Sequence, residues 1–227
     1  MEKYEVLVVG RGKLAAELLH GLRGSSISGV LPWSERARPE QGRRMVVHAG
    51  SGRELDEVVD FCATGGEMLF ELSTAGSRLP SKPAFPIIVC PNVNMQMLSF
   101  MAMIKQSANR FKGQDIEITE SHQAAKRTKP GTAVYIARSL GIAEDAIRSI
   151  RDPRTQREVL NIPSEFLDRH AYHEVSIRNG DVHIRLESRV LGKSAYASGL
   201  AEIIGLASTR ALPPGLHDVV DLILGGM

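Results

Sequence analysis

A glycine-rich turn between an apolar run and a helical pattern constrains this chain more than any other feature. The apolar run Glu5–Val9 (EVLVV) has the length and composition of a buried parallel strand. The turn Gly10-Arg11-Gly12-Lys13-Leu14-Ala15 follows and fits the pattern G-x-G-x-x-A, and the residues after it place leucines at helical spacing. A strand, a tight turn and a helix in this order predict a dinucleotide-binding domain.

Each small residue of the turn has a physical role in that prediction. Gly10 permits the tight turn, Gly12 lets a pyrophosphate approach the backbone, and Ala15 allows close packing of helix and strand. The phosphates would lie at the helix N-terminus, where free N–H groups favour anions. The expected cofactor contacts are Gly10, Arg11, Gly12, Lys13 and Leu14. The alternative is a plain turn between a strand and a helix.

The remaining elements of the first half alternate between strand and helix. Strands are expected at Ile27–Leu31, Met45–His48, Met68–Leu72 and Pro86–Cys90, and a helix at Glu54–Cys62. This alternation predicts a parallel sheet with right-handed crossovers, in which ligands bind beyond the carboxyl ends of the strands. The turns at those ends would face a nicotinamide through Ser73, Thr74, Gly76, Pro91 and Asn92.

The segment after the second strand bears on the choice between NADPH and NADH. Ser34, Arg36 and Arg38 could hold a 2′-phosphate, which favours NADPH, whereas Glu35 could accept from ribose hydroxyls and keeps NADH open. A solvated basic loop accounts for the same residues equally well.

The second half has a different pattern. A helix is expected over 94–112, an alternating strand over Gln114–Glu120, a helix over Thr132–Leu140, and a hairpin of Tyr172–Arg178 and Asp181–Arg189 around Asn179-Gly180. Such a mixed, mainly antiparallel sheet often buries its apolar face in a second copy, so a homo-oligomer is expected. Helix Ser194–Ala207 and a terminal piece Leu216–Leu224 would return to the first domain.

The expected architecture is therefore α/β with two domains. Residues 1–93 and 191–227 would form a Rossmann-like dinucleotide-binding domain, and residues 94–190 a smaller mixed α+β domain for substrate binding and oligomerisation. A chain of 227 residues is long enough to bury a core in each domain.

Composition excludes several other classes of function. A net charge of +2 gives no case for a nucleic-acid binder, and the apolar run MLSFMAMI is too short to span a membrane. The N-terminus lacks the layout of a signal peptide, and Cys62 and Cys90 have no framework spacing, so a reducing cytoplasm is expected. No metal is predicted, because His170, His173 and His183 lack a ligand spacing and are interpreted as surface or strand residues.

The stretch Glu120–Ala133 (ESHQAAKRTKPGTA) is the strongest candidate for catalysis. His122 and Lys126 lie four residues apart and could deliver a proton to a hydride acceptor such as an imine. Gly131 and Thr132 begin a helix, so Thr132 could cap it and the free N–H groups could hold a carboxylate. An exposed basic loop is the alternative.

This stretch and several others resemble segments of a known family. DIEITESHQAAKRTKPGTA resembles the signature E-x-H-H-x-x-x-K-x-D-A-P-S-G-T-A of dihydrodipicolinate reductase, which reduces a cyclic imine dicarboxylate in lysine and diaminopimelate biosynthesis. The segments GRGKLA, STAG, CPNVNMQM, ESRVLGKSAYASGLAEII and GLHDVVDLIL resemble other family segments in the same order. The resemblance implies an NADPH- or NADH-dependent homotetramer with His122 as general acid and Lys126 as proton donor. It also implies that Gly131 and Thr132 bind the substrate carboxylate.

The loop also departs from the family signature. Gln123 replaces the second histidine and becomes the expected substrate contact there, Thr128 replaces the aspartate, Lys129 replaces the alanine, and the serine before Gly-Thr is absent. Two other functions therefore stay open: a related reductase for another cyclic imine, and an NADP(H)-binding module without catalysis.

Overall fold

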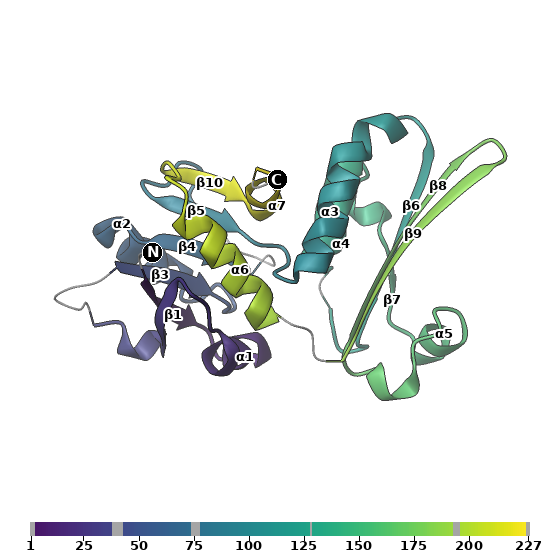
Figure 1. The fold of residues 1–227 in the computed structure, drawn as a ribbon. Coiled ribbons are helices and arrows are strands. Elements are labelled where there is room, and N and C mark those ends of the chain that lie inside the picture. The colour runs from purple at the N-terminus through teal and green to yellow at the C-terminus, as the bar shows by residue number, and fades with distance from the viewer. Residues whose placement is uncertain (1–2, 38–42, 74–77, 128, 193–195, 226–227) are drawn as a thin grey trace. The chain divides into compact units, whose positions relative to one another are not determined.

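The structure is a computed structural model that describes residues 3–37, 43–73, 78–127, 129–192 and 196–225. It divides into two compact units, one of residues 1–98 and 195–227 and the other of residues 99–194. Both units are drawn in Figure 1. No helix among the described residues is long and apolar enough to cross a membrane.

The first unit is built on a six-stranded parallel sheet, as the alternating pattern predicted. The strand order is β10-β5-β4-β3-β1-β2, and every neighbouring pair is parallel. The strands are β1 Tyr4–Val9, β2 Ile27–Pro32, β3 Arg43–His48, β4 Met68–Glu71, β5 Pro86–Val89 and β10 Gly215–Asp218. The helices are α1 Lys13–Gly21, α2 Leu55–Gly65, α6 Tyr196–Ser208, α7 Val219–Leu224 and the short 3-10 helix η1 Trp33–Glu35.

Register places the carboxyl ends of four strands in one row. Val9 is paired with His48, His48 with Glu71, and Glu71 with Val89. The turns that follow these residues therefore begin at the same edge of the sheet, as the sequence predicted.

The two faces of this sheet carry different helices. Alternate strand residues such as Leu7, Val46 and Leu69 pack with Leu55, Val58 and Cys62 of α2. On the other face α1 and α6 pack on each other, with Leu18 and Leu200 fully buried. This alternation gives a three-layer unit with one apolar core on each side of the sheet.

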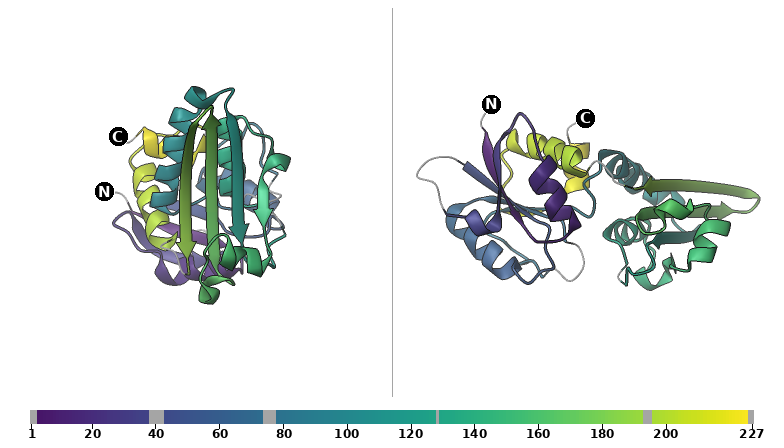
Figure 2. Two further views of the ribbon diagram at one scale, coloured as in Figure 1. Left: turned by 90° about the vertical axis from the view of Figure 1, so that its right-hand side faces the viewer. Right: turned by 90° about the horizontal axis from the view of Figure 1, so that it is seen from below.

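The second unit contains a four-stranded mixed sheet in the order β7-β6-β8-β9. Its strands are β6 Asp115–His122, β7 Arg148–Ile150, β8 His170–Asn179 and β9 Val182–Leu191, shown side by side in Figure 2. The helices are α3 Met95–Ser107, through which the division into units passes, α4 Gly131–Leu140, α5 Pro153–Glu158 and the 3-10 helices η2 Ala108–Phe111, η3 Glu144–Ala146 and η4 Ser164–Phe166. Pairs β6–β8 and β8–β9 are antiparallel and β6–β7 is parallel. The prediction of a mixed, mainly antiparallel sheet is confirmed.

Two local interpretations of the sequence are corrected by the structure. The terminal piece Leu216–Leu224 is two elements, an edge strand β10 beside β5 and the helix α7, with Asp218 accepting from the backbone N–H of Val220 at 2.9 Å between them. The hairpin turn lies one residue later than expected, because Asn179 pairs with Val182 and leaves Gly180 and Asp181 as the loop. Gly180 takes a φ of +56°, which glycine adopts without strain at the first position of such a turn.

Close packing at one glycine gives a test of the fold. A Cβ added at Gly199 in α6 would lie 2.0 Å from the carbonyl oxygen of Val93, so the helix rests directly on that backbone. We expect Gly199→Ala to lower the free energy of unfolding by about 1–3 kcal/mol, the usual cost of overpacking. Urea denaturation followed by circular dichroism measures the change.

Gly205 provides the matched control in the same helix. An added Cβ there meets no heavy atom within 4 Å. Gly205→Ala should therefore leave stability unchanged or raise it by up to about 1 kcal/mol, because alanine has the higher helix propensity. Equal effects of the two substitutions would contradict the packing described for α6.

Candidate functional site

An acid–base cluster lies at the end of β6 in the second unit. Ile118, Glu120 and His122 alternate along the strand and so point to the same face of the sheet. His173 of β8 stands opposite Glu120 on that face, with its ring edge-to-face against His122 at 5.6 Å between centroids. The apolar face of the sheet therefore ends in ionisable groups, all of them buried.

The Glu120 carboxylate is the centre of this cluster. Its Oε2 accepts from His122 Nδ1 at 2.8 Å, and its two oxygens accept from Arg151 Nη2 at 2.6 Å and Nη1 at 3.1 Å. Burial raises the pKa of Glu120, but hydrogen bonds from His122, Arg151 and Ser149 outweigh it and hold the pKa at about 2. Glu120 is therefore a carboxylate at neutral pH although no part of its side chain is exposed.

His122 and Lys126 both have pKa values below their ordinary range. Burial lowers the pKa of His122, the Glu120 carboxylate opposes this, and the charges of Lys126 and Arg151 lower it further. Burial also lowers the pKa of Lys126. The Glu120 charge raises this pKa, and the Arg151 charge lowers it. Because His122 Nδ1 faces a carboxylate, Nδ1 carries the hydrogen and Nε2 keeps a lone pair in the neutral ring. The structure thus brings together the two residues that the sequence assigned to proton transfer.

The start of α4 differs from the sequence prediction in one respect. The helix is capped by Pro130, whose ring provides no hydrogen-bonding side chain, and Thr132 is the second helical residue rather than the cap. Gly131 is half-buried and Thr132 buried. The N-cap residue Pro130 thus makes no side-chain hydrogen bond to the first turn of α4, and a helix N-terminus is a favourable place for an anion.

The altered loop has its own anchors. The backbone N–H of Lys126 donates to the carbonyl of Gln123, which closes a turn, and Lys129 Nζ donates to the carbonyl of Glu144. Gln123 is half-buried at the end of β6, while Arg127 is exposed. Thr128 lies outside the described residues. The Lys129 ammonium is therefore directed to the segment after α4.

The other histidines that were interpreted as surface or strand residues all lie in strands. His170 and His173 do lie in β8, but both are buried, whereas His183 is exposed in β9. His170 Nε2 lies 3.0 Å from Ser121 Oγ, and burial lowers its pKa. Burial, with a smaller effect from the His122 charge, lowers the pKa of His173 to about 3. In the sequence, Ile116, Ile118 and Glu120 stand at every second position of β6. This spacing was a signal that their side of the sheet is buried.

In the first unit the glycine turn has the geometry that the pattern predicted. Gly10 has a φ of +125°, and a Cβ there would lie 2.6 Å from the carbonyl oxygen of Ala49. A Cβ at Gly12 would meet no heavy atom of the described residues within 4 Å, and Gly12 caps α1 without a side-chain hydrogen bond. Arg11 and Lys13 are exposed beside it, and Leu14 is half-buried. Open space and uncapped N–H groups fit a bound pyrophosphate.

A buried histidine–carboxylate pair beside this turn was missed by sequence reasoning. His48 Nδ1 lies 2.8 Å and 2.9 Å from the two oxygens of Glu71, and Glu71 also accepts from the backbone N–H of Ser73 at 2.7 Å. The pair ties the end of β3 to the segment after β4. Thr74 and Gly76, which were expected to contact the cofactor, lie outside the described residues, as does Arg38.

Two other expected cofactor segments have local partners. Asn92 Oδ1 accepts from the backbone N–H of Asn94 at 2.8 Å in the turn that starts at Pro91. Arg36 stacks on Trp33 with its guanidinium 5.0 Å from the ring centroid and pairs with Glu57 at 2.7 Å. Ser34 is exposed in η1. Arg36, which follows β2 in the chain, is thus held against the ring of Trp33.

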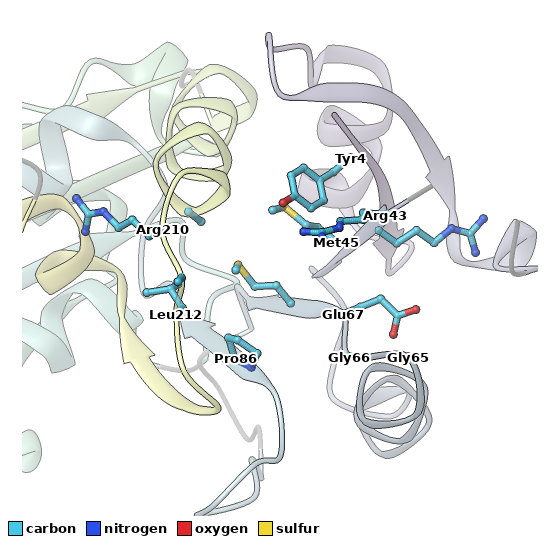
Figure 3. A pocket seen from close by; sticks show the side chains of 13 residues that line it. Tyr4, Arg43, Met45, Gly65, Gly66, Glu67, Pro86, Arg210 and Leu212 are labelled. Carbon is cyan, nitrogen blue, oxygen red and sulfur yellow. The ribbon is translucent and has the colours of Figure 1, made fainter. Parts of the chain in front are cut away.

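A hollow of about 420 Å³ in the first unit does not belong to this rim. Its walls come from the amino ends of the strands, the opposite edge of the sheet, and include Tyr4, Met45, Met68 and Pro86. Figure 3 shows Tyr4, Met45 and Pro86 around this hollow, and Arg43 and Arg210 also line it. No group of three or more potential metal ligands occurs in the part of the chain that the structure describes.

Residues 97–223 match the family model described as dihydrodipicolinate reductase, C-terminus. The chain is 33% identical over 128 residues to 4-hydroxy-tetrahydrodipicolinate reductase 2, chloroplastic, of Arabidopsis thaliana, covering 52% of this chain and 37% of that protein. It is 31% identical over 121 residues to 4-hydroxy-tetrahydrodipicolinate reductase of Rickettsia akari, covering 50% and 48%. The matched part of the chain thus spans less than half the length of these relatives.

Solved structures share the fold. A dipicolinate-bound dihydrodipicolinate reductase from Paenisporosarcina sp. TG-14 superposes with a TM-score of 0.63 at 15% identity, covering 95% of this chain and 97% of that one. A probable dehydrogenase from Thermotoga maritima gives a TM-score of 0.55 at 11% identity, covering 98% and 94%. At these identities the likeness establishes the α/β two-domain architecture.

The buried Glu120 carboxylate predicts a specific acid dependence of stability. Its folded pKa of about 2 lies below the ordinary value of 4.5, so its stabilising effect is complete above pH 4.5 and is lost as pH falls through 2. We expect the free energy of unfolding of Glu120→Gln to fall less steeply than that of the unsubstituted protein over this window. Chemical denaturation at several pH values measures both slopes.

The control is Glu158→Gln, which removes a carboxylate that is 58% exposed. An exposed pair of this kind contributes little to stability, so the slope should change little. Parallel slopes for Glu120→Gln and the unsubstituted protein would show that the Glu120 carboxylate is not held by its neighbours.

Proposed function

The chain belongs to the dihydrodipicolinate reductase family, and we propose that it reduces 4-hydroxy-tetrahydrodipicolinate to tetrahydrodipicolinate with NADPH or NADH. The observation that carries this proposal is the Glu120–His122–Lys126 cluster, which stands on the family motif inside the matched segment. The relatives named above bear the name of this reductase.

The cofactor residues in this proposal are Gly10, Gly12 and the N-terminus of α1. The fit is supported by the space that the described residues leave open at Gly12, which caps α1 without a side-chain hydrogen bond. A bound reduced dinucleotide would supply the hydride. The backbone of the turn would hold its phosphates, and Arg11 and Lys13 would add positive charge beside them.

Lys126 is assigned as the proton donor. Loss of the 4-hydroxyl group as water gives the unsaturated dihydrodipicolinate ring. The hydride then carries two electrons and one hydrogen to that ring, so one proton must follow to complete the reduction. An ammonium with a lowered pKa gives up its proton more readily, and burial and the Arg151 charge both act in that direction. His122 is neutral at rest, and its Nε2 lone pair suits it to relay a proton that restores Lys126.

The carboxylates of the substrate are assigned to the start of α4. Backbone N–H groups at the start of α4, near Gly131 and Thr132, would donate to one carboxylate, and Gln123 would contact the same ligand from the end of β6. Arg127 is an exposed cation nearby in the sequence and adds to the attraction of a dianion.

A second candidate is the reduction of a different cyclic imine acid. The altered residues Gln123 and Lys129 favour it, because Lys129 is already bound to the carbonyl of Glu144. A panel of cyclic imines decides between the two: turnover of the lysine-pathway compound alone removes this candidate.

We further propose a cytoplasmic homotetramer, on the resemblance to the family. Light scattering of the purified chain gives the mass directly, and a monomer would overturn this part of the proposal.

The proposed role of Lys126 predicts a separation of chemistry from binding. Lys126→Ala should lower kcat by roughly 100-fold or more, the usual contribution of a positioned acid, while NADPH affinity stays unchanged. Oxidation of NADPH with enzymatically generated substrate gives kcat, and calorimetry gives affinity.

Lys112→Ala, which removes an exposed lysine of the same unit, is the control and should leave kcat unchanged. Equal losses of kcat and cofactor affinity in Lys126→Ala would contradict the assignment. No turnover by folded, cofactor-binding protein would overturn the proposed function itself.

Arg36 predicts the cofactor preference. If its guanidinium holds a 2′-phosphate, Arg36→Ala should weaken NADPH binding by about 10-fold, the value of one charge-assisted hydrogen bond, and leave NADH binding unchanged. Arg23→Ala, which removes an exposed arginine after α1, serves as the control. Equal weakening of both cofactors would assign Arg36 to the fold through its contacts with Trp33 and Glu57 instead.

A further inference from the structure

Arg151, the residue after β7, donates hydrogen bonds to both Glu120 and Lys126, the two ends of the proposed Glu120–His122–Lys126 cluster. Its Nη2 and Nη1 donate to Glu120 at 2.6 Å and 3.1 Å, and its Nε donates to the main-chain carbonyl of Lys126 at 3.0 Å. Nη1 also donates to the carbonyl of Ile150 at 3.0 Å. The Arg151 side chain is 22% exposed, so it is held mainly by these bonds.

The fork shape of the guanidinium matters here. One flat group meets a carboxylate with two nitrogens and a main-chain carbonyl with the third. A lysine ammonium is a single point with three donors on one atom, so it cannot reproduce this spread. Glu120 in turn orients His122 through Nδ1, and the turn from Gln123 to Lys126 is closed by a backbone hydrogen bond of 2.9 Å.

We propose that Arg151 is a positioning residue that fixes His122, through Glu120, and the Lys126 turn in one arrangement. No sequence pattern assigned it a role, and it need not touch the substrate. The inference rests on the proposed function only for its effect on turnover. Its effects on the titration of His122 and on the mobility of the Lys126 turn are independent of any substrate.

Several charged or titratable groups face this cluster. Glu120 lies between His122 and Arg151, Ser149 of β7 hydrogen-bonds the same carboxylate, and His173 of β8 borders His122. His170 lies on the opposite face of the sheet, bound to Ser121. The Arg151 charge lowers the pKa of both His122 and Lys126, so removing that charge should raise both pKa values.

Two substitutions separate position from charge. Arg151→Lys keeps the positive charge and loses the fork, whereas Arg151→Met loses both. The control is Arg154→Met in α5, which removes an arginine that is 78% exposed and pairs with Glu158 four residues along the helix. That substitution should leave activity, titration and exchange unchanged.

The substrate-free experiment combines nuclear magnetic resonance titration with hydrogen exchange. We expect Arg151→Lys to raise the exchange rate of the Lys126 amide while the pKa of His122 stays close to that of the unsubstituted protein. Arg151→Met should raise that exchange rate and also raise the pKa of His122 and Lys126. Unchanged exchange of the Lys126 amide in Arg151→Lys would overturn the proposal, and this variant keeps the test open if Arg151→Met fails to fold.

The turnover experiment then connects position to catalysis. With equal folded content, Arg151→Lys should lower kcat by about 10-fold or more without changing NADPH affinity, since small misplacements of reacting groups are costly. A wild-type kcat in Arg151→Lys would overturn the positioning role. If the unsubstituted protein shows no turnover, the proposed function fails, whereas the titration and exchange results still decide the role of Arg151.

Discussion

The buried Glu120 carboxylate is the constraint on which the arrangement of the second unit depends. An unpaired charge at such a position would be strongly destabilising, so the surrounding chain must bring partners to both oxygens. His122 comes from the same strand, while Arg151 and Ser149 come from the edge strand β7 and its end. The same bonds that satisfy the carboxylate also fix the imidazole and the turn that carries Lys126. Stability and the proposed chemistry therefore rest on one network.

The first unit uses a related device at the carboxyl edge of its sheet. His48 and Glu71 stand side by side because β3 and β4 pair in register, and their bond links two turns of the rim. Glu71 also holds the N–H of Ser73, so the segment after β4 starts from a fixed point. The buried His48–Glu71 pair thus holds the start of the neighbouring loops. The described residues still leave space beside Gly12. Rigid strand ends thus support loops that are free to carry function.

The sequence predicted the features that depend on local patterns. The parallel sheet followed from alternating apolar runs, the glycine turn from its strand–turn–helix setting, and the pair His122 and Lys126 from a compact motif. It did not predict Arg151, because β7 is only three residues long and its bond to Glu120 crosses 31 positions of sequence. The His48–Glu71 pair was missed for the same reason, since strand neighbours and register come from tertiary packing. Thr132 was placed at the helix cap because Pro130 provides no capping side chain that a pattern could recognise.

Main-chain anchors hold the loop in which this chain departs from the family signature. The main chain is held before this segment by Arg151 at the Lys126 carbonyl and within it by Lys129 at the Glu144 carbonyl. Pro130 then fixes an extended backbone, with a φ of −71° and a ψ of 142°, from which α4 starts. These anchors use main-chain carbonyls and a proline ring, so they do not depend on the aspartate or serine of the family signature. The departures from the signature therefore change which side chains a ligand would meet at this helix N-terminus.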